Sequence, residues 1–160
     1  MSEIDLALTV NGVAVRARIP ARMHLVDFLR ERLDLTGSHL GCEHGVCGAC
    51  TIRVDGLAVR GCLMLAAQAD GAFVETIEGL TQSGAIADLQ AAFVARNALQ
   101  CGFCTAGMLV TASELLARGG IPDRAEIRAE IAGNYCRCTG YHAIVDAIES
   151  VARDRAGAPP

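Results

Sequence analysis

Apolar residues alternate with polar or small residues along the first twenty positions of the chain. The alternation runs through residues 4–10 and again through residues 13–19, and Asn11-Gly12 separates the two runs. A period of two is typical of a β-strand with one buried face, and Asn-Gly favours the type I′ turn of a tight hairpin. The pattern therefore predicts a β-hairpin, which ends at Pro20.

The segment that follows predicts one helix and three further strands. Apolar residues in 25–33 recur at helical spacing, and residues 51–60 form two short strand-like runs around Asp55-Gly56. Residues 73–77 predict a last strand. Two strands, a helix and three more strands in this order suggest a small β-grasp sheet crossed by one helix.

From residue 85 onward the apolar spacing is helical. Asp123 with Glu126 favours the start of one of these helices, and Thr139 is expected to be the N-cap of the last one, which places His142 at its third position. Four short helices suggest a compact bundle. The helices are predicted from apolar stripes in 86–94, 108–116, 127–131 and 141–151.

The change of period divides the chain into two domains. A polar, Gly-rich stretch separates them and is the candidate linker. The fold class expected is therefore α+β, with the sheet domain first. The predicted boundaries are 1–78 for the β-grasp domain, 79–84 for the linker, 85–155 for the helical-bundle domain and 156–160 for a tail.

Composition narrows the function classes. The chain has 160 residues, a net charge of −4 and no basic stripe, which argues against nucleic-acid binding. No apolar run is long enough to span a membrane, and the N-terminus does not resemble a signal peptide, so a soluble cytoplasmic protein is predicted. The cytosol keeps thiols reduced, and its clustered cysteines are more often metal ligands than disulfides.

The first four of the eight cysteines have the spacing C-x4-C-x2-C…C. Cys42, Cys47 and Cys50 lie in a Gly-rich loop, and the predicted hairpin places Cys50 opposite Gly61, so that Cys62 returns beside the loop. This spacing is the plant-type pattern that holds a [2Fe–2S] cluster, whereas zinc sites usually pair two C-x2-4-C knuckles. The first set therefore predicts an iron–sulfur cluster.

The other four cysteines form a C-x2-C pair, Cys101 with Cys104, and a C-x-C pair, Cys136 with Cys138. Each pair precedes a predicted helix, and the positive end of a helix dipole favours thiolates and an anionic cluster. By itself this spacing also fits zinc or a redox-active C-x2-C. The presence of both sets in one short chain favours a second iron–sulfur cluster.

Three segments carry a family resemblance that covers nearly the whole chain. Gly41-Cys-Glu-His-Gly-Val-Cys-Gly-Ala-Cys-Thr51, Gln100-Cys-Gly-Phe-Cys-Thr-Ala-Gly-Met108 and Asn134-Tyr-Cys-Arg-Cys-Thr-Gly-Tyr141 resemble the iron–sulfur subunit of molybdenum hydroxylases. These include xanthine oxidase, carbon monoxide dehydrogenase and aldehyde oxidoreductase. The resemblance implies a ferredoxin-like β-grasp domain followed by a four-helix-bundle domain, each with one [2Fe–2S] cluster. Ala106 replaces a proline that is common in the family, and only a local backbone effect is expected.

The resemblance also implies an order of centres and a set of partners. It places the cluster of the second set near a molybdopterin cofactor, with Gln100 and Cys138 beside the pterin. It places the cluster of the first set near FAD. The implied partners are a large molybdopterin-binding subunit and a medium FAD-binding subunit, assembled as a dimer of heterotrimers.

The chain is expected to perform no substrate chemistry itself. It carries no nucleophile–base constellation, and His24, His39, His44 and His142 are expected to be structural or surface residues. The function predicted is that of an electron-transfer subunit of an oxidoreductase, relaying electrons from molybdopterin through two clusters to FAD. The alternatives are a free-standing ferredoxin-type shuttle, a two-subunit variant that delivers electrons to a cytochrome, and a zinc-stabilised interaction module. Substrate selectivity belongs to the molybdenum subunit in the leading interpretation.

Overall fold

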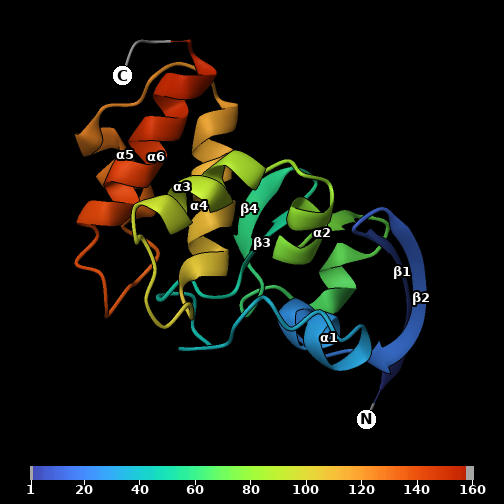
Figure 1. Cartoon of the computed structure of the whole chain (residues 1–160). Helices are drawn as coiled ribbons and strands as arrows, with labels where there is room; N and C mark the ends of the chain where they lie inside the picture. The colour runs from blue at the N-terminus through green and yellow to red at the C-terminus, as the bar shows by residue number, and fades with distance from the viewer. Residues whose placement is uncertain (1, 158–160) are drawn as a thin grey trace.

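The computed structural model describes residues 2–157 of the chain. Its N-terminal half is a twisted five-stranded sheet with the strand order β2-β1-β5-β3-β4, crossed by one helix (Figure 1). β1 and β5 are parallel and the other neighbours are antiparallel. The elements are β1 (Glu3–Val10), β2 (Val13–Pro20), α1 (Leu25–Arg32), β3 (Thr51–Val54), β4 (Leu57–Arg60), the 3₁₀ helix η1 (Ala66–Ala69) and β5 (Phe73–Glu75).

Both predicted hairpins form, with the turn type that their sequences favour. Asn11 and Gly12 have φ angles of 50° and 81°, and the Asp55-Gly56 turn also has two positive φ values. Positive φ at both central residues defines a type I′ turn. Beyond the second hairpin the amide N–H of Gly61 donates to the carbonyl of Cys50 at 3.1 Å, which confirms the predicted register.

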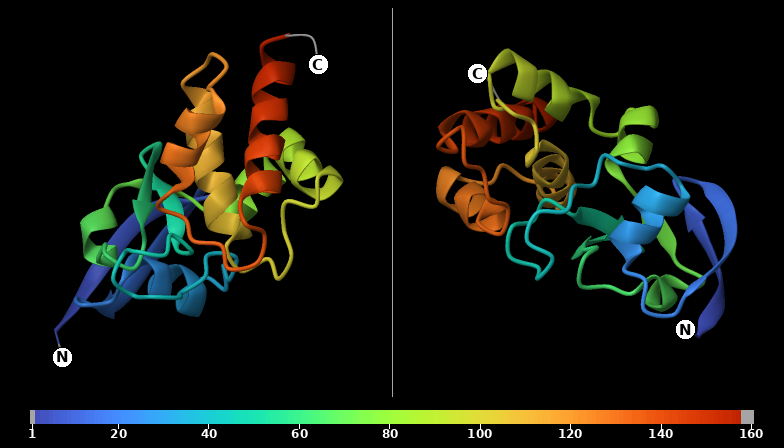
Figure 2. Two further views of the ribbon diagram at one scale, coloured as in Figure 1. Left: turned by 90° about the vertical axis from the view of Figure 1, so that its left-hand side faces the viewer. Right: turned by 90° about the horizontal axis from the view of Figure 1, so that it is seen from below.

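The C-terminal half is helical (Figure 2). The four predicted helices correspond to α3–α6, and a further short helix, α2, occupies most of the predicted linker 79–84. This stretch is polar in composition, but one of its residues is buried. Leu80 packs into the core of the helical half. The elements are α2 (Ile77–Gln82), α3 (Ala87–Ala95), α4 (Thr105–Ala117), α5 (Arg124–Ile131) and α6 (His142–Arg155).

The prediction that Thr139 caps the last helix is wrong. The helix begins at His142, which is therefore its first residue, and Tyr141 precedes it with a left-handed φ of 69°. The Thr139 hydroxyl instead accepts a hydrogen bond from the Tyr141 N–H at 3.2 Å and lies 3.1 Å from the Cys136 sulfur. The side chain holds the loop before the helix, so it is unavailable to the first turn of α6.

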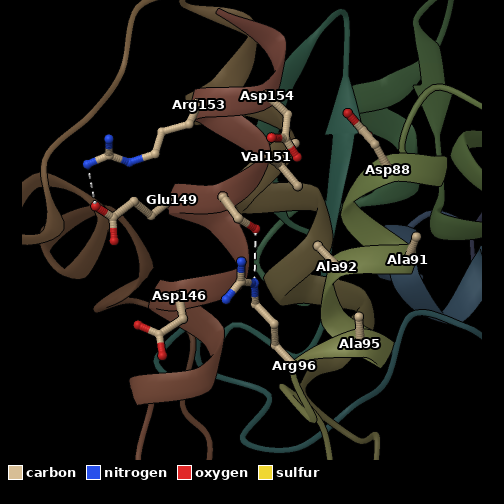
Figure 3. Close-up of a pocket in the computed structure, with 11 residues that line it drawn as sticks. Asp88, Ala91, Ala92, Ala95, Arg96, Asp146, Glu149, Val151, Arg153 and Asp154 are labelled. Atoms are coloured by element: carbon tan, nitrogen blue, oxygen red, sulfur yellow. Dashed lines mark hydrogen bonds and ion pairs between the residues drawn. The ribbon is translucent and has the colours of Figure 1, made fainter. Parts of the chain in front are cut away.

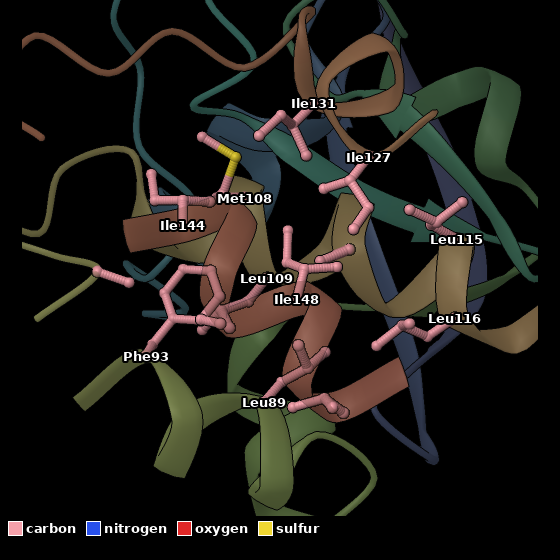
Figure 4. Close-up of a cluster of buried hydrophobic side chains, with 14 of the residues drawn as sticks. Leu89, Phe93, Met108, Leu109, Leu115, Leu116, Ile127, Ile131, Ile144 and Ile148 are labelled. Atoms are coloured by element: carbon pink, nitrogen blue, oxygen red, sulfur yellow. The ribbon is translucent and has the colours of Figure 1, made fainter. Parts of the chain in front are cut away.

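The two halves have separate hydrophobic cores. Phe28 is fully buried beneath the sheet, and Phe93 and Met108 lie in the core between the helices (Figure 4). Helix α4 stands between the two cores and is joined to the sheet by Ser113, which accepts from Arg53 at 2.7 Å. No helix in the described part of the chain is both long and apolar enough to cross a membrane.

Candidate metal centres

The cysteines of the first set differ in how deeply they are buried. Cys50 and Cys62 are buried and pack with Val26 of α1 and with Leu40. Cys42 lies on the outer side of the loop and is partly exposed. The hairpin return delivers Cys62 to this site, as the strand register predicted.

The same loop creates opposite electrostatic surroundings at its two sides. The backbone N–H groups of Cys47 and His44 point at the Cys42 sulfur and lower its pKa to about 6; the Cys47 nitrogen is 3.4 Å away. Burial raises the pKa of the Cys50 thiol to about 11, and the neighbouring Cys62 adds to this. The loop thus offers N–H donors to the Cys42 sulfur and buried surroundings to the Cys50 sulfur. Hydrogen bonds to sulfur and solvent exposure both tune the reduction potential of an iron–sulfur centre.

Glycine is required in this loop for two different reasons. Gly45 and Gly48 both have positive φ, which an L side chain rarely adopts. A Cβ on Gly45 would lie 2.3 Å from the side chain of Leu63, and a Cβ on Gly48 would lie 2.4 Å from the carbonyl oxygen of Gly133. The loop therefore needs glycine both for its path and for its contact with the helical half.

The second cysteine set assembles from segments that are far apart in the sequence. Cys104 is the N-cap residue of α4, whereas Cys136 and Cys138 lie in the loop that precedes α6. Together with Cys101 and Gln100 they line one hollow. The Cys101 and Cys138 sulfurs are 3.6 Å apart.

The thiols of the second set also differ in their surroundings. Burial raises the pKa of Cys104 to about 12, and the adjacent Cys136 contributes in the same direction. Burial also acts to raise the pKa of Cys136, but hydrogen bonds from the side chain and backbone of Thr139 outweigh it, so the pKa is lowered. Thr139 is therefore a donor to sulfur, the role that backbone groups play at Cys42.

The sulfurs of each set form two pairs. Among residues 2–157 no group of three or more Cys, His, Asp or Glu side chains is placed to hold a single metal ion. In the second set each pair takes one cysteine from each motif, whereas a zinc knuckle would direct both cysteines of C-x2-C at one ion. A [2Fe–2S] cluster takes two thiolates on each of its irons, so the arrangement fits such a cluster in both sets. The thiols that interact with each other through their side chains are Cys42 with Cys47, Cys50 with Cys62, Cys101 with Cys138, and Cys104 with Cys136.

Comparison with known proteins agrees with this chemistry. A model of a 2Fe-2S iron-sulfur cluster binding domain matches residues 8–76, and a model of a [2Fe-2S] binding domain matches residues 76–149. The gamma subunit of caffeine dehydrogenase from Pseudomonas sp. (strain CBB1) is 51% identical over 154 residues, which cover 94% of this chain and 92% of that protein. The small subunit of nicotine 6-hydroxylase from Paenarthrobacter nicotinovorans is 52% identical over 145 residues, with coverage of 91% and 87%.

The fold comparison completes the assignment. The solved structure of quinoline 2-oxidoreductase from Pseudomonas putida 86 contains a chain that is 48% identical, with a TM-score of 0.90 and coverage of 99% of this chain and 100% of that one. This chain is a small iron–sulfur subunit of the molybdenum hydroxylase family. The α+β fold, the two [2Fe–2S] domains in this order and the electron-transfer role predicted from the sequence are confirmed.

In this iron–sulfur subunit Gln100 lies beside the second cysteine set. Its side-chain amide donates to the carbonyl oxygen of Cys138 at 3.0 Å, and the residue is exposed. Helix α3 ends at Ala95, so Gln100 belongs to the loop that carries Cys101 and not to a helix end. The structure brings together the two residues that the sequence suggested for a pterin contact, which stays a prediction.

Sequence reasoning missed the contacts that join the two cysteine loops of the subunit. The Tyr135 N–H donates to the carbonyl of Cys47 at 2.8 Å. On the other side His39 stacks on Phe103 with ring centroids 4.7 Å apart, and its Nδ1 lies 2.8 Å from the Phe103 carbonyl oxygen. Only the position of these residues next to the cysteine motifs could have signalled the contacts, because nothing in a sequence pattern pairs one loop with the other.

A groove between α3 and α6 lies apart from this chemistry (Figure 3). None of the eight cysteines is among its lining residues. Its lining includes small side chains such as Ala92 and Ala95, and Arg96 of the lining donates to Ser150 at 3.1 Å. The groove is a surface feature of the helical half.

Proposed function

We propose that this subunit relays electrons from a molybdopterin centre on a large partner subunit, through two [2Fe–2S] clusters, to FAD on a medium partner subunit. The observation that carries the proposal is the presence of two complete cysteine sets, each arranged as two pairs of interacting thiols, on one chain. A single-cluster shuttle needs only one such set. The proposed assembly is a dimer of heterotrimers in the cytoplasm.

The eight cysteines are the proposed ligands. When bound, each cluster would accept and return one electron at a time. The two electrons of a substrate oxidation on another subunit would therefore pass through this chain one by one. The FAD-side cluster is assigned to Cys42, Cys47, Cys50 and Cys62, and the molybdopterin-side cluster to Cys101, Cys104, Cys136 and Cys138.

A relay between two partners is supported by the separate surfaces that the two sets expose. Cys101 and Cys138 are exposed and have Gln100 beside them, so a cofactor of a partner subunit can approach this set directly. The first set is flanked by Val46 and Leu63, apolar side chains that are 43% and 61% exposed. Each set thus has its own accessible surface, as a relay between two partners requires.

The chain's residues would tune the centres and transfer no protons. Donors to sulfur favour the more negative, reduced cluster and raise its reduction potential. The Cys47 N–H performs this role at Cys42, and the Thr139 hydroxyl and N–H perform it at Cys136. These contacts give each cluster its own surroundings, so two distinct potentials are expected.

The experiment is to purify the complex by a tag on this chain, identify its subunits and cofactors, and record EPR spectra of the reduced protein. Two distinct [2Fe–2S] signals, together with molybdopterin and FAD in the co-purifying subunits, are expected. Zinc in place of iron, one cluster per chain, or a chain that elutes alone in gel filtration would contradict the proposal.

The order of centres is tested with Cys47→Ser and Cys138→Ser in the same complex. With Cys47→Ser, substrate should still reduce the molybdopterin-side cluster while the flavin stays oxidised. With Cys138→Ser, neither the remaining cluster nor the flavin should be reduced by substrate. Flavin reduction at the parent rate in the first variant would show that the proposed order is wrong.

A further inference from the structure

Arg60 is the last residue of β4, the edge strand of the sheet, which packs beside helix α4 (Figure 1). Two residues further along the chain is Cys62 of the first cysteine set. The strand register also sets Arg60 opposite Thr51, the residue that follows Cys50. The hairpin therefore holds Arg60 close to two cysteines of the first set, one along the chain and one across to β3.

The guanidinium of Arg60 links the two halves of the molecule. One of its nitrogens donates to the hydroxyl of Thr51, and another donates to the carbonyl oxygen of Gly133 at 2.7 Å. Gly133 lies three residues before Cys136 of the second set. Its carbonyl oxygen also meets the first cysteine loop, since a Cβ on Gly48 would lie 2.4 Å from it. The guanidinium thus lies where β3, the first cysteine loop and the segment before the second set come together.

No ion pair in residues 2–157 includes Arg60. The carboxylate that contacts β4 belongs to Glu114, which accepts from the Ala58 N–H at 2.8 Å and pairs with Arg118 at 3.7 Å. Arg60 itself is partly buried, and both of its hydrogen-bond acceptors are neutral oxygens. Its charge therefore has no counter-ion among the side chains that the structure describes.

A charge that is withdrawn from water is normally balanced by an opposite charge. The two cysteine sets would supply that charge when they hold their clusters. Four thiolates and two sulfides outweigh the charge of two ferric ions, so a [2Fe–2S] cluster with its ligands is an anion, and reduction makes it more negative. A guanidinium stays protonated in proteins, so it offers a positive charge to both redox states.

We propose that Arg60 is a counter-charge that the two clusters share, and that it raises the reduction potential of both. The inference rests on the proposed function, because it takes the eight cysteines as cluster ligands. A fixed positive charge favours the more negative, reduced form of each cluster. Arg60 thus makes both centres better electron acceptors, and no atom or proton changes place.

Arg60→Gln tests this role in the whole complex, purified by a tag on this chain. The variant removes the charge and leaves an amide that can still donate a hydrogen bond. Redox titration followed by EPR measures the midpoint potential of each cluster separately. At a fixed potential the ratio of reduced to oxidised cluster is expected to fall about tenfold at both centres, which is about 59 mV for a one-electron couple. Two unit charges about 10 Å apart interact with this order of strength at an effective dielectric constant of about 20.

Two further arginine variants separate the charge from the contacts. Arg60→Lys keeps the charge but loses the planar fork that reaches two oxygens at once, so both potentials should stay near their parent values. Arg16→Gln is the matched control, because it removes the same charge from an exposed position on β2, at the opposite edge of the sheet. Both potentials should keep their parent values in this variant too, since solvent and salt screen an exposed, distant charge.

The outcomes separate this inference from the proposed function. A parent complex without two distinct cluster signals contradicts the proposed function before any potential is compared. With both signals present, parent potentials in Arg60→Gln, or a fall confined to one cluster, overturn the shared counter-charge. An equal fall in Arg60→Lys also overturns it, because the loss would then follow the contacts and not the charge. If Arg60→Gln does not assemble, Arg60→Met takes its place with the same expectation, since its flexible side chain fills similar space without charge.

Discussion

The two cysteine sets are assembled in opposite ways. In the first set three cysteines lie within one short loop, and the fourth arrives by the return of an adjacent hairpin. In the second set two motifs that are far apart along the chain meet, and the core between α3, α4, α5 and α6 holds them in place (Figure 4). The first site is thus assembled locally and the second through tertiary packing.

This difference indicates what each site depends on. A locally assembled site depends on backbone geometry, so its glycines are its weak points. A site assembled by packing depends on the core that positions its segments, so distant apolar residues become part of its support. The following predictions test that contrast.

The largest effect is expected from removing one ligand of either set. Cys62→Ser should abolish the signal of the first cluster and Cys104→Ser that of the second, and each should remove half of the iron. The Cys104 side chain makes no capping hydrogen bond to α4, so the helix should persist in the second variant. Iron analysis and EPR of the complex test this, and loss of both signals in either variant would show that the sites are not independent.

The thiols of the iron-free protein should differ strongly in reactivity. At pH 7 Cys42, with a pKa of about 6, is mostly thiolate, whereas Cys50, with a pKa of about 11, is almost all thiol. After allowing for the lower nucleophilicity of a low-pKa thiolate, Cys42 should react with iodoacetamide on the order of a hundredfold faster. Labelling at timed intervals, followed by peptide mass spectrometry, measures both rates.

The pH dependence of this labelling follows from the direction of the shift. The pKa of Cys42 is lower in the folded protein than its ordinary value of 9.0. Its thiolate therefore stabilises the folded state fully above pH 9.0, and this stabilisation is lost as the pH falls through about 6. The labelling rate of Cys42 should therefore fall below pH 6, while that of Cys50 stays low up to pH 10. Equal rates at pH 7 would contradict the loop geometry.

Core substitutions should distinguish the two modes of assembly. Ile148→Ala in the helical core and Leu29→Ala in the sheet core remove similar, fully buried side chains, and each should lower the free energy of unfolding by about 2–5 kcal/mol. Ile148→Ala should also speed iron loss from the second set, since its two motifs depend on that core. Leu29→Ala should affect iron loss from the first set less, because three of its ligands share one loop.

Chelator challenge with EPR detection measures these rates, and denaturant unfolding measures the stability. The contrast between the two sites would be wrong if the sheet-core variant released its cluster as readily as the helical-core variant.

Gly48→Ala should be more damaging than Gly56→Ala. Both positions have positive φ, so each substitution carries a strain of about 1–2 kcal/mol. A Cβ at Gly56 meets no atom within 4 Å, whereas a Cβ at Gly48 would overlap the carbonyl of Gly133, which adds roughly 1–3 kcal/mol. Denaturant unfolding of the two variants isolates the added cost, and equal losses would show that the loops do not meet closely at Gly48.

Local sequence patterns predicted much of the fold. The two hairpins, the helix between them and the four helices α3–α6 follow from periodicity and turn residues, because these signals act over a few neighbouring positions. Helix α2 was missed since its single buried anchor, Leu80, gives no period. The start of α6 was misplaced because the Thr139 hydroxyl binds within its own loop instead of capping the helix.

For the candidate sites, spacing was enough to recognise two cysteine sets and to place Cys62 beside the first loop. Residue order contains no information on which sulfur of one distant motif faces which sulfur of the other. The pairs Cys101 with Cys138 and Cys104 with Cys136 exist only because the packing of α4 and α6 brings their loops together. The contact between Tyr135 and Cys47 arises in the same way, from two backbones that meet where glycine leaves room.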